Sequence, residues 1–307
     1  MKCLITFKPV IPVNEIARYL SISPHRIYVV EDGALEPDII TDTTVLITRG
    51  GIHRQEEYTD KIPGLSIIGR PGSGIEFINR LKSLKKGILY LNSGEASAQA
   101  VAEHTLLLAL ILIKKYKSFA KEIEELRWNR LADIPSLLKG KTAGIIGMGN
   151  CGLAFAKIIH KLGGKVIFYD PYLFLNRIPY QQVFSFDELL PLSDIISIHV
   201  NYTEKTRYLI NEETLCKCKK NAIIINTARG GVVNTAHILN ALIDGRISGY
   251  AADVFEYENE SFSAIKKEGI SYLQKLRSLN TVVITPHIAG SFPEIRLLTE
   301  KLSLIHI

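Results

Sequence analysis

Short apolar runs alternate with amphipathic stretches along the first ninety residues. The runs are rich in β-branched residues and have Gly or Pro at their edges, which favours strands buried in a parallel sheet. The predicted strands are residues 2–7, 26–30, 45–48, 66–69 and 88–91. Helical spacing over 14–20 and 75–84 places helices between strands, so this part of the chain is predicted to form a β/α array.

A second array follows a long helix predicted over about 97–129, which the sequence at 132–136 interrupts. Its predicted strands are residues 142–147, 165–169, 195–199, 222–226, 249–252 and 282–285. Six strands with intervening helices is the count expected of a complete dinucleotide-binding fold. The predicted fold class is therefore α/β, with two doubly wound parallel-sheet domains.

Composition and charge narrow the range of function classes. The 307 residues exceed what one hydrophobic core usually organises. An apolar fraction of 47% with 22% charged residues excludes a disordered or collagen-like chain. The net charge of +6 is small for this length and is spread along the chain. It suits anionic small molecules but makes no case for a nucleic-acid partner.

The four cysteines form neither a CxxC pair nor a zinc spacing, so we expect free thiols, a reducing cytoplasmic location and no metal site. Residues 2–7 are interpreted as a first strand rather than a signal peptide, because Lys8 and Pro9 end the apolar run. The longest uncharged stretch, 105–113, is too short to span a bilayer. No membrane partner is expected.

A glycine-rich turn lies between the predicted strand at 142–147 and an apolar helix. Gly147-Met148-Gly149-Asn150-Cys151-Gly152 has the GxGxxG pattern, whose glycines permit the turn, the approach of a pyrophosphate and helix packing. Asp170 ends the next strand, 18 residues past Gly152, where a carboxylate accepts from both ribose hydroxyls and repels a 2′-phosphate. The sequence predicts NAD rather than NADP; the alternative is a glycine turn with a chance aspartate.

Three ionisable side chains come just after strands of the second array. Arg229 follows 222–226, Asp253 follows 249–252 with Glu258 five residues on, and His287 follows 282–285. The carboxyl ends of parallel strands form the ligand crevice of such a sheet. Each residue has an alternative explanation, as a surface arginine, a helix-capping aspartate or a core histidine, but their joint placement favours a catalytic site.

These motifs together resemble the D-isomer-specific 2-hydroxyacid dehydrogenases, from about Val45 to Gly290. The matching stretches are 101–105, 140–142 leading into 147–152, His199 with Thr203, 226–231, 252–255 with Glu258, and 285–290. The resemblance implies that Arg229 binds the substrate carboxylate, that His287 is the acid/base and that Glu258 pairs with His287. It implies that Asp253 holds the nicotinamide carboxamide. The implied cofactor contacts are Gly147, Gly149, Asn150, Cys151, Gly152, Asp170, His199, Thr203, Thr227, Ala228, Asp253, His287 and Gly290.

The resemblance also implies a division of labour between domains. A Rossmann NAD-binding domain would cover 96–289, and a flavodoxin-like substrate domain would cover 1–95 joined by about 290–307. Substrate binding would involve Arg49, Ser73, Gly74 and Arg229, with a plain turn at 72–74 as the alternative. The resemblance further implies a homodimer formed through the NAD-binding domains and the long helix.

We therefore expect hydride transfer between NAD(H) and a small anionic 2-hydroxy or 2-keto acid, of the 3-phosphoglycerate or glycerate/hydroxypyruvate type. The alternatives are a non-enzymatic, corepressor-like NAD sensor of the same fold and an inactive, truncated gene product. Residues 302–307 resemble the translation of a transposon end used in sequencing libraries, so we expect the natural chain to depart from this sequence near Lys301.

Overall fold

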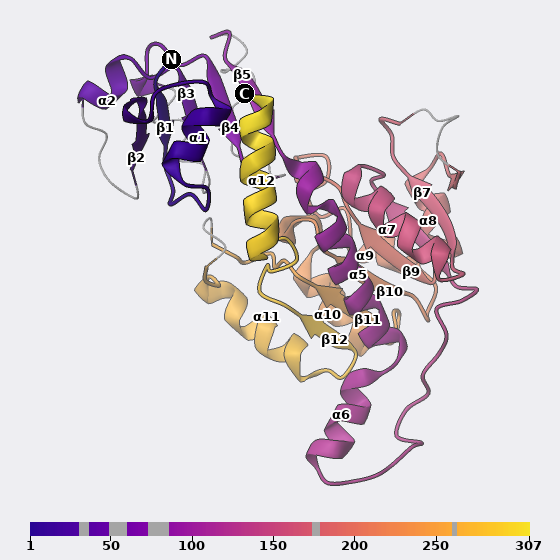
Figure 1. Cartoon of the computed structure of the whole chain (residues 1–307). Helices are drawn as coiled ribbons and strands as arrows, with labels where there is room; N and C mark the ends of the chain where they lie inside the picture. Colours follow the sequence, from indigo (N-terminus) through magenta and orange to yellow (C-terminus); the bar gives the residue numbers. More distant parts are fainter. Residues whose placement is uncertain (31–36, 49–59, 73–85, 174–178, 260–262) are drawn as a thin grey trace. The chain divides into compact units, whose positions relative to one another are not determined.

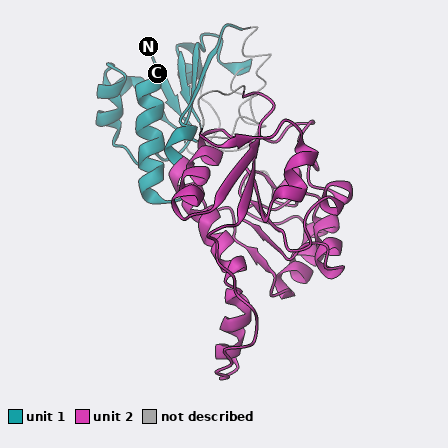
Figure 2. Cartoon of the chain, turned by 90° about the vertical axis from the view of Figure 1, so that its right-hand side faces the viewer, with its two compact units in different colours: residues 1–97, 290–307 teal, residues 98–289 magenta. Residues whose placement is uncertain are grey.

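The computed structural model describes residues 1–30, 37–48, 60–72, 86–173, 179–259 and 263–307. The chain divides into two compact units (Figure 2). Unit 1 comprises residues 1–97 and 290–307, and unit 2 comprises residues 98–289. Because each unit has its own sheet and its own buried clusters, each is described by itself.

Unit 1 is built on a five-stranded sheet whose described pairings are all parallel. Its strands are β1 (Cys3–Ile5), β2 (Ile27–Val29), β3 (Val45–Ile47), β4 (Ile67–Arg70) and β5 (Leu89–Asn92), in the order β2-β1-β3-β4-β5. This order is that of flavodoxin-like folds. Alternate side chains of β1 enter different clusters, since Cys3 and Ile5 pack on one face and Leu4 on the other.

The described part of unit 1 also contains helices and short 3-10 turns. They are α1 (Val13–Tyr19), η1 (Pro24–Arg26), α2 (Pro37–Thr41), η2 (Gly94–Ser97) and α12 (Pro293–His306). The last of these contacts the segment between β1 and α1, where Glu300 Oε2 accepts from the backbone N–H groups of Val10 at 2.7 Å and Ile11 at 3.2 Å. The predicted helix over 75–84 lies outside the described residues. The origin of residues 302–307, which continue α12, stays a prediction.

Unit 2 is built on a seven-stranded parallel sheet, of which β7 and β9 to β12 are labelled in Figure 1. Its strands are β6 (Thr142–Ile146), β7 (Lys165–Tyr169), β8 (Gln181–Gln182), β9 (Ile195–Ile198), β10 (Ile223–Asn226), β11 (Gly249–Ala252) and β12 (Val282–Ile284). The order β12-β11-β10-β9-β6-β7-β8 is the Rossmann order extended by one strand. The two sheets confirm the predicted fold class. The short β8 was not predicted, because two glutamines carry no apolar run.

Helices cover both faces of this sheet, and a buried cluster lies under each face. They are α5 (Ala98–Ile113), α6 (Tyr116–Glu124), α7 (Asn150–Lys161), α8 (Phe186–Leu192), α9 (Glu212–Cys216), η3 (Gly230–Val232), α10 (Thr235–Ile243) and α11 (Lys267–Ser278). Residues 94–113 are long and apolar enough to cross a membrane by length and composition alone. Within unit 2, however, α5 packs as a core helix, with Ala102, Leu108 and Ala109 fully buried among the side chains of α7 and the sheet.

The prediction of one continuous helix over 97–129 is wrong. Lys115 adopts a left-handed backbone conformation with φ of +55°, so α5 ends before it and α6 begins after it. Just beyond the turn, Lys117 Nζ donates to the carbonyl oxygens of Arg277, Leu279 and Val282 at 2.8 to 3.2 Å. These contacts fix the direction of α6, and periodicity along the sequence carries no signal for them.

Candidate active site

The glycine loop follows β6, and two of its glycines are required by the protein itself. Gly147 has φ of +88°, and a Cβ there would lie 2.7 Å from the carbonyl oxygen of His199. A Cβ on Gly152 would lie 2.1 Å from the carbonyl oxygen of Gly147. Both distances are far shorter than a normal contact, so no side chain fits at either position.

The middle glycine of the loop is different. Gly149 precedes α7, and no described atom lies within 4 Å of the Cβ that a larger residue would place there. No side chain caps this end of α7, and no acidic residue lies in its first turn. The open space and the unsatisfied N–H groups of the helix start fit a bound pyrophosphate. The fit to a dinucleotide therefore rests on the shape of the loop as well as on its sequence.

Asp170 lies beside the glycine loop at the end of β7. Its Oδ2 accepts from Met148 N at 2.9 Å, and its Oδ1 accepts from Tyr172 N at 2.9 Å. The carboxylate is thus fixed by backbone donors at the place predicted for the adenosine ribose. Within residues 170–173, no cation accompanies it that could pair with a 2′-phosphate.

His199 follows β9 and supports the glycine loop through its backbone. Its N–H donates to Ile146 O at 2.8 Å, and its Nε2 lies 2.8 Å from Ser197 Oγ. The ring packs against Phe155, with centroids 5.7 Å apart. Burial lowers the pKa of His199 to about 4, so the imidazole is neutral at pH 7.

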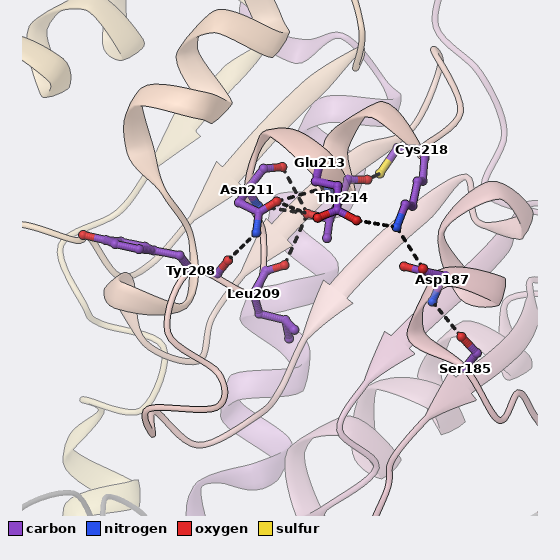
Figure 3. Close-up of polar contacts among 9 residues, drawn as sticks. Ser185, Asp187, Tyr208, Leu209, Asn211, Glu213, Thr214 and Cys218 are labelled. Carbon is purple, nitrogen blue, oxygen red and sulfur yellow. Dashed lines mark hydrogen bonds and ion pairs between the residues drawn. The ribbon is translucent and has the colours of Figure 1, made fainter.

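Thr203 is exposed at the start of the segment that joins β9 to α9. Its N–H donates to Thr206 Oγ1 at 2.8 Å. Further along, Asn211 Nδ2 donates to Tyr208 O at 3.1 Å, and Thr214 Oγ1 donates to Leu209 O at 3.2 Å (Figure 3). Side chains of the segment therefore fold it on itself and fix its path.

Arg229 lies in a turn that is stabilised by hydrogen bonds from the side chain of Asn226. The fully buried Asn226 side chain accepts from Ala228 N at 3.1 Å and donates to Arg229 O at 2.9 Å. Arg229 Nη1 donates in turn to Ala228 O at 2.7 Å. Thr227 points away into the interior, where its hydroxyl lies 3.0 Å from Thr105 Oγ1. The turn thus holds the guanidinium in one place.

Two observations place the Arg229 turn between the glycine loop and the segment that carries Glu258. Burial raises the pKa of the Cys151 thiol and the charge of the Arg229 guanidinium lowers it, so the arginine lies near the start of α7. On the other side, a Cβ on Gly230 would lie 2.1 Å from the carbonyl carbon and oxygen of Phe255. The turn and the Phe255 backbone are therefore in direct contact.

His287 and Glu258 lie within hydrogen-bond distance, with Nδ1 and Oε2 2.8 Å apart. The histidine side chain is 24% exposed and the glutamate 13%. The other glutamate oxygen accepts from Phe255 N, which fixes the carboxylate to the segment that contacts the Arg229 turn. The structure thus brings together the three predicted catalytic residues along one edge of the sheet.

Asp253, which the resemblance assigns to the nicotinamide, is 1% exposed and already accepts from the protein. Its Oδ1 accepts from Thr285 Oγ1 at 2.5 Å and Ile288 N at 2.9 Å, and its Oδ2 accepts from Ala289 N at 2.8 Å. Burial raises the pKa of Asp253, but hydrogen bonds from His104, Thr285 and the backbone outweigh it and hold the pKa below its usual value. The carboxylate is therefore ionised, and it organises the loop that carries His287.

Some predicted site residues do not belong to the described part of unit 2. Arg49, Ser73 and Gly74 lie outside the described residues, and Gly290 belongs to unit 1. Over the described ranges, no group of three or more His, Cys, Asp or Glu side chains could hold a metal ion. Sequence reasoning missed the buried contacts of His104 and Thr285, whose partners lie far away in the chain.

A Rossmann sheet with an open glycine loop and an Arg–Glu–His edge defines a nicotinamide-dependent oxidoreductase. A family model described as D-isomer specific 2-hydroxyacid dehydrogenase, NAD binding domain, matches residues 106–289. The hydroxypyruvate reductase of Thermotoga maritima is 35% identical over 287 residues, which cover 92% of this chain and 90% of that protein. The D-lactate dehydrogenase of Aquifex aeolicus complexed with NAD and lactic acid matches 98% of this chain and 93% of its own, with a TM-score of 0.81 and 28% identity.

The D-3-phosphoglycerate dehydrogenase of Bacillus subtilis is 34% identical over 254 residues, which cover 82% of this chain. They cover only 46% of that protein, so the chain spans about half the length of this relative. The chain belongs to the D-isomer-specific 2-hydroxyacid dehydrogenases. Its activity is that of an NAD-dependent oxidoreductase of small 2-hydroxy and 2-keto acids.

Proposed function

We propose that the chain reduces a small anionic 2-keto acid to its D-2-hydroxy acid, with His287 as the proton donor. The observation that carries this proposal is the His287–Glu258 contact of 2.8 Å beside the Arg229 turn. Glu258 holds the ring through Nδ1, so Nε2 is the nitrogen that would exchange its proton with the substrate oxygen.

Arg229 would bind the substrate carboxylate, because a guanidinium fork matches the two oxygens of that group. When bound, NADH supplies the hydride. The residues proposed to hold it are the glycine loop with Asn150 and Cys151, together with Asp170, His199, Thr203, Thr227, Ala228, Asp253, His287 and Gly290. The open space at Gly149 and the fixed Asp170 carboxylate support this assignment.

Within this class, we favour hydroxypyruvate or its phosphorylated form as substrate. The relatives named hydroxypyruvate reductase and D-3-phosphoglycerate dehydrogenase support this choice, as does the net charge of +6. We assign unit 2 to NAD binding and unit 1 to substrate binding, with Arg49, Ser73 and Gly74 contributing from unit 1. The four cysteines are free, which fits a cytoplasmic location.

The experiment is NADH consumption by the purified chain with hydroxypyruvate, phosphohydroxypyruvate, glyoxylate and pyruvate. We expect turnover, fastest with one of the first two acids. If glyoxylate or pyruvate is fastest, the substrate assignment is wrong but the reductase stands. A folded chain that binds NADH and turns over none of the four would contradict the reductase, and would favour a binding role or an inactive product.

We further propose that the chain forms a homodimer through the arm at residues 114–138 of unit 2. Several apolar side chains of this arm are exposed, among them Leu126 at 96%, Trp128 at 86% and Leu131 at 90%. Pairing with the same arm of a second copy would cover them in a symmetric interface. Light scattering should give twice the chain mass, and Trp128→Asp with Leu131→Asp should give the monomer. A wild-type monomer at micromolar concentration would contradict the proposal.

A further inference from the structure

The backbone of His287 has a conformation that needs support. Its φ is +55°, in the left-handed region that residues other than glycine rarely adopt. Such a conformation persists only where the surrounding structure holds it. The first support is direct, because the N–H of His287 donates to the carbonyl oxygen of Asp253 at 2.7 Å.

The Asp253 carboxylate provides the second support. The two N–H groups that follow His287 converge on it, with Ile288 N donating to Oδ1 at 2.9 Å and Ala289 N donating to Oδ2 at 2.8 Å. Successive N–H groups around a left-handed residue form a concave anion site. The carboxylate fills that site and so holds His287 in its conformation.

The carboxylate is itself held from the interior. Thr285 Oγ1 donates its only proton to Asp253 Oδ1 at 2.5 Å. His104 Nε2 lies 2.9 Å from the same hydroxyl, which must then accept from it, so His104 carries a proton on Nε2. Nε2 also lies 3.4 Å from Asp253 Oδ1. His104 is 6% exposed and lies on α5, so these groups tie the His287 loop to the central helix of unit 2.

We propose that His104 and Thr285 are positioning residues for the acid/base His287, an inference that rests on the proposed function. They act through Asp253, which fixes the loop and therefore the Nδ1–Glu258 contact. If the Thr285 hydroxyl or the His104 ring is lost, the loop relaxes and the distance between His287 Nδ1 and the Glu258 carboxylate increases. The ring is then held less firmly in the orientation that proton transfer needs, and the reduction slows.

The test compares His104→Leu and Thr285→Val with the conservative variants His104→Gln and Thr285→Ser, which keep the hydrogen-bonding groups. The readouts are kcat and KM for keto-acid reduction, the dissociation constant of NADH and the thermal midpoint. We expect the two apolar variants to lower kcat about tenfold with KM nearly unchanged. NADH binding should stay within about twofold, and the conservative variants should restore most of kcat.

Thr285→Val is nearly isosteric, so it provides the test even if His104→Leu does not fold. If the apolar variants lose thermal stability but keep the wild-type kcat, the two residues are merely structural and the inference is wrong. His287→Ala separates this result from failure of the proposed function. An inactive His287→Ala beside an unaffected Thr285→Val overturns the inference alone, whereas an active His287→Ala overturns the role of His287 and the inference with it.

Discussion

The two halves of the strand-end edge in unit 2 are built in different ways. The glycine loop between β6 and α7 depends on the backbone, because Gly147 and Gly152 leave no room for a Cβ. The His287 loop after β12 depends on side chains, because Asp253, Thr285 and His104 hold its backbone through hydrogen bonds. The glycine loop keeps its shape because two of its positions have no side chain. The His287 loop keeps its shape because polar side chains form hydrogen bonds with its backbone.

The difference has a functional consequence. A cofactor loop must bind the same ligand in every turnover. Close packing of the backbone at the glycines keeps the conformation of the loop constant with few polar groups. An acid/base must hold its ring in one orientation, and the ring of His287 is held by a carboxylate from another segment, 255–258, through the Nδ1–Oε2 contact. We therefore expect substitutions in the first half to affect binding and folding, and those in the second half to affect turnover.

A large effect is expected for Arg229→Lys, at the boundary of the two halves. A lysine keeps the charge but loses the fork, so kcat/KM for the keto acid should fall about a hundredfold. NADH affinity, measured by fluorescence titration, should stay within a few fold. If kcat/KM changes less than threefold, Arg229 does not bind the substrate carboxylate.

The next prediction separates folding from binding within the glycine loop. Gly152→Ala should lower the free energy of unfolding by about 1 to 3 kcal/mol, because its Cβ meets the Gly147 carbonyl. Gly149→Ala is the matched control, since its Cβ meets no described atom. Urea unfolding should show wild-type stability for this control, whereas its NADH affinity should fall. Wild-type affinity in Gly149→Ala would mean that no pyrophosphate approaches there.

His199 should make stability dependent on pH in the glycine-loop half. Its pKa of about 4 in the folded chain is below its unfolded value near 6.5, so the unfolded state binds more protons between these values. The contribution is present above pH 6.5 and is lost as pH falls towards 4, which amounts to about 2 kcal/mol between pH 7 and 5. Urea unfolding at both pH values should show this extra loss relative to His199→Asn. Equal losses in the two proteins would contradict it.

The smallest effect is expected for Asp170→Ala. Without the carboxylate, the chain loses both an acceptor for the ribose and the repulsion of a 2′-phosphate. The preference for NADH over NADPH in kcat/KM should fall about tenfold, because one charge-assisted contact is removed. An unchanged preference would assign the discrimination to another residue.

Much of the fold follows from local sequence patterns. Apart from β8, the strands of both sheets are short apolar runs that can be recognised one by one. Asp170 follows the glycine loop at a fixed distance, so the loop and the carboxylate can be recognised together within a window of some thirty residues. The break at Lys115 and the two-residue strand β8 could not be recognised, because the first depends on contacts with 277–282 and the second carries no apolar pattern. The ends of the predicted strands were enough to predict that Arg229, Glu258 and His287 lie along one edge of the sheet in unit 2. The partnership of His104 with Thr285 spans 181 residues and has no local signal.

The most direct measurement pairs turnover with NADH binding in His287→Ala. We expect NADH consumption with hydroxypyruvate to fall by about 10² to 10⁴-fold, while the dissociation constant of NADH stays within about threefold of the wild type, because the other residues proposed to hold NADH remain. Near-normal turnover in this variant would contradict the assignment of His287 as the acid/base. An equal loss of NADH binding would contradict the separation of the edge into a binding half and a catalytic half.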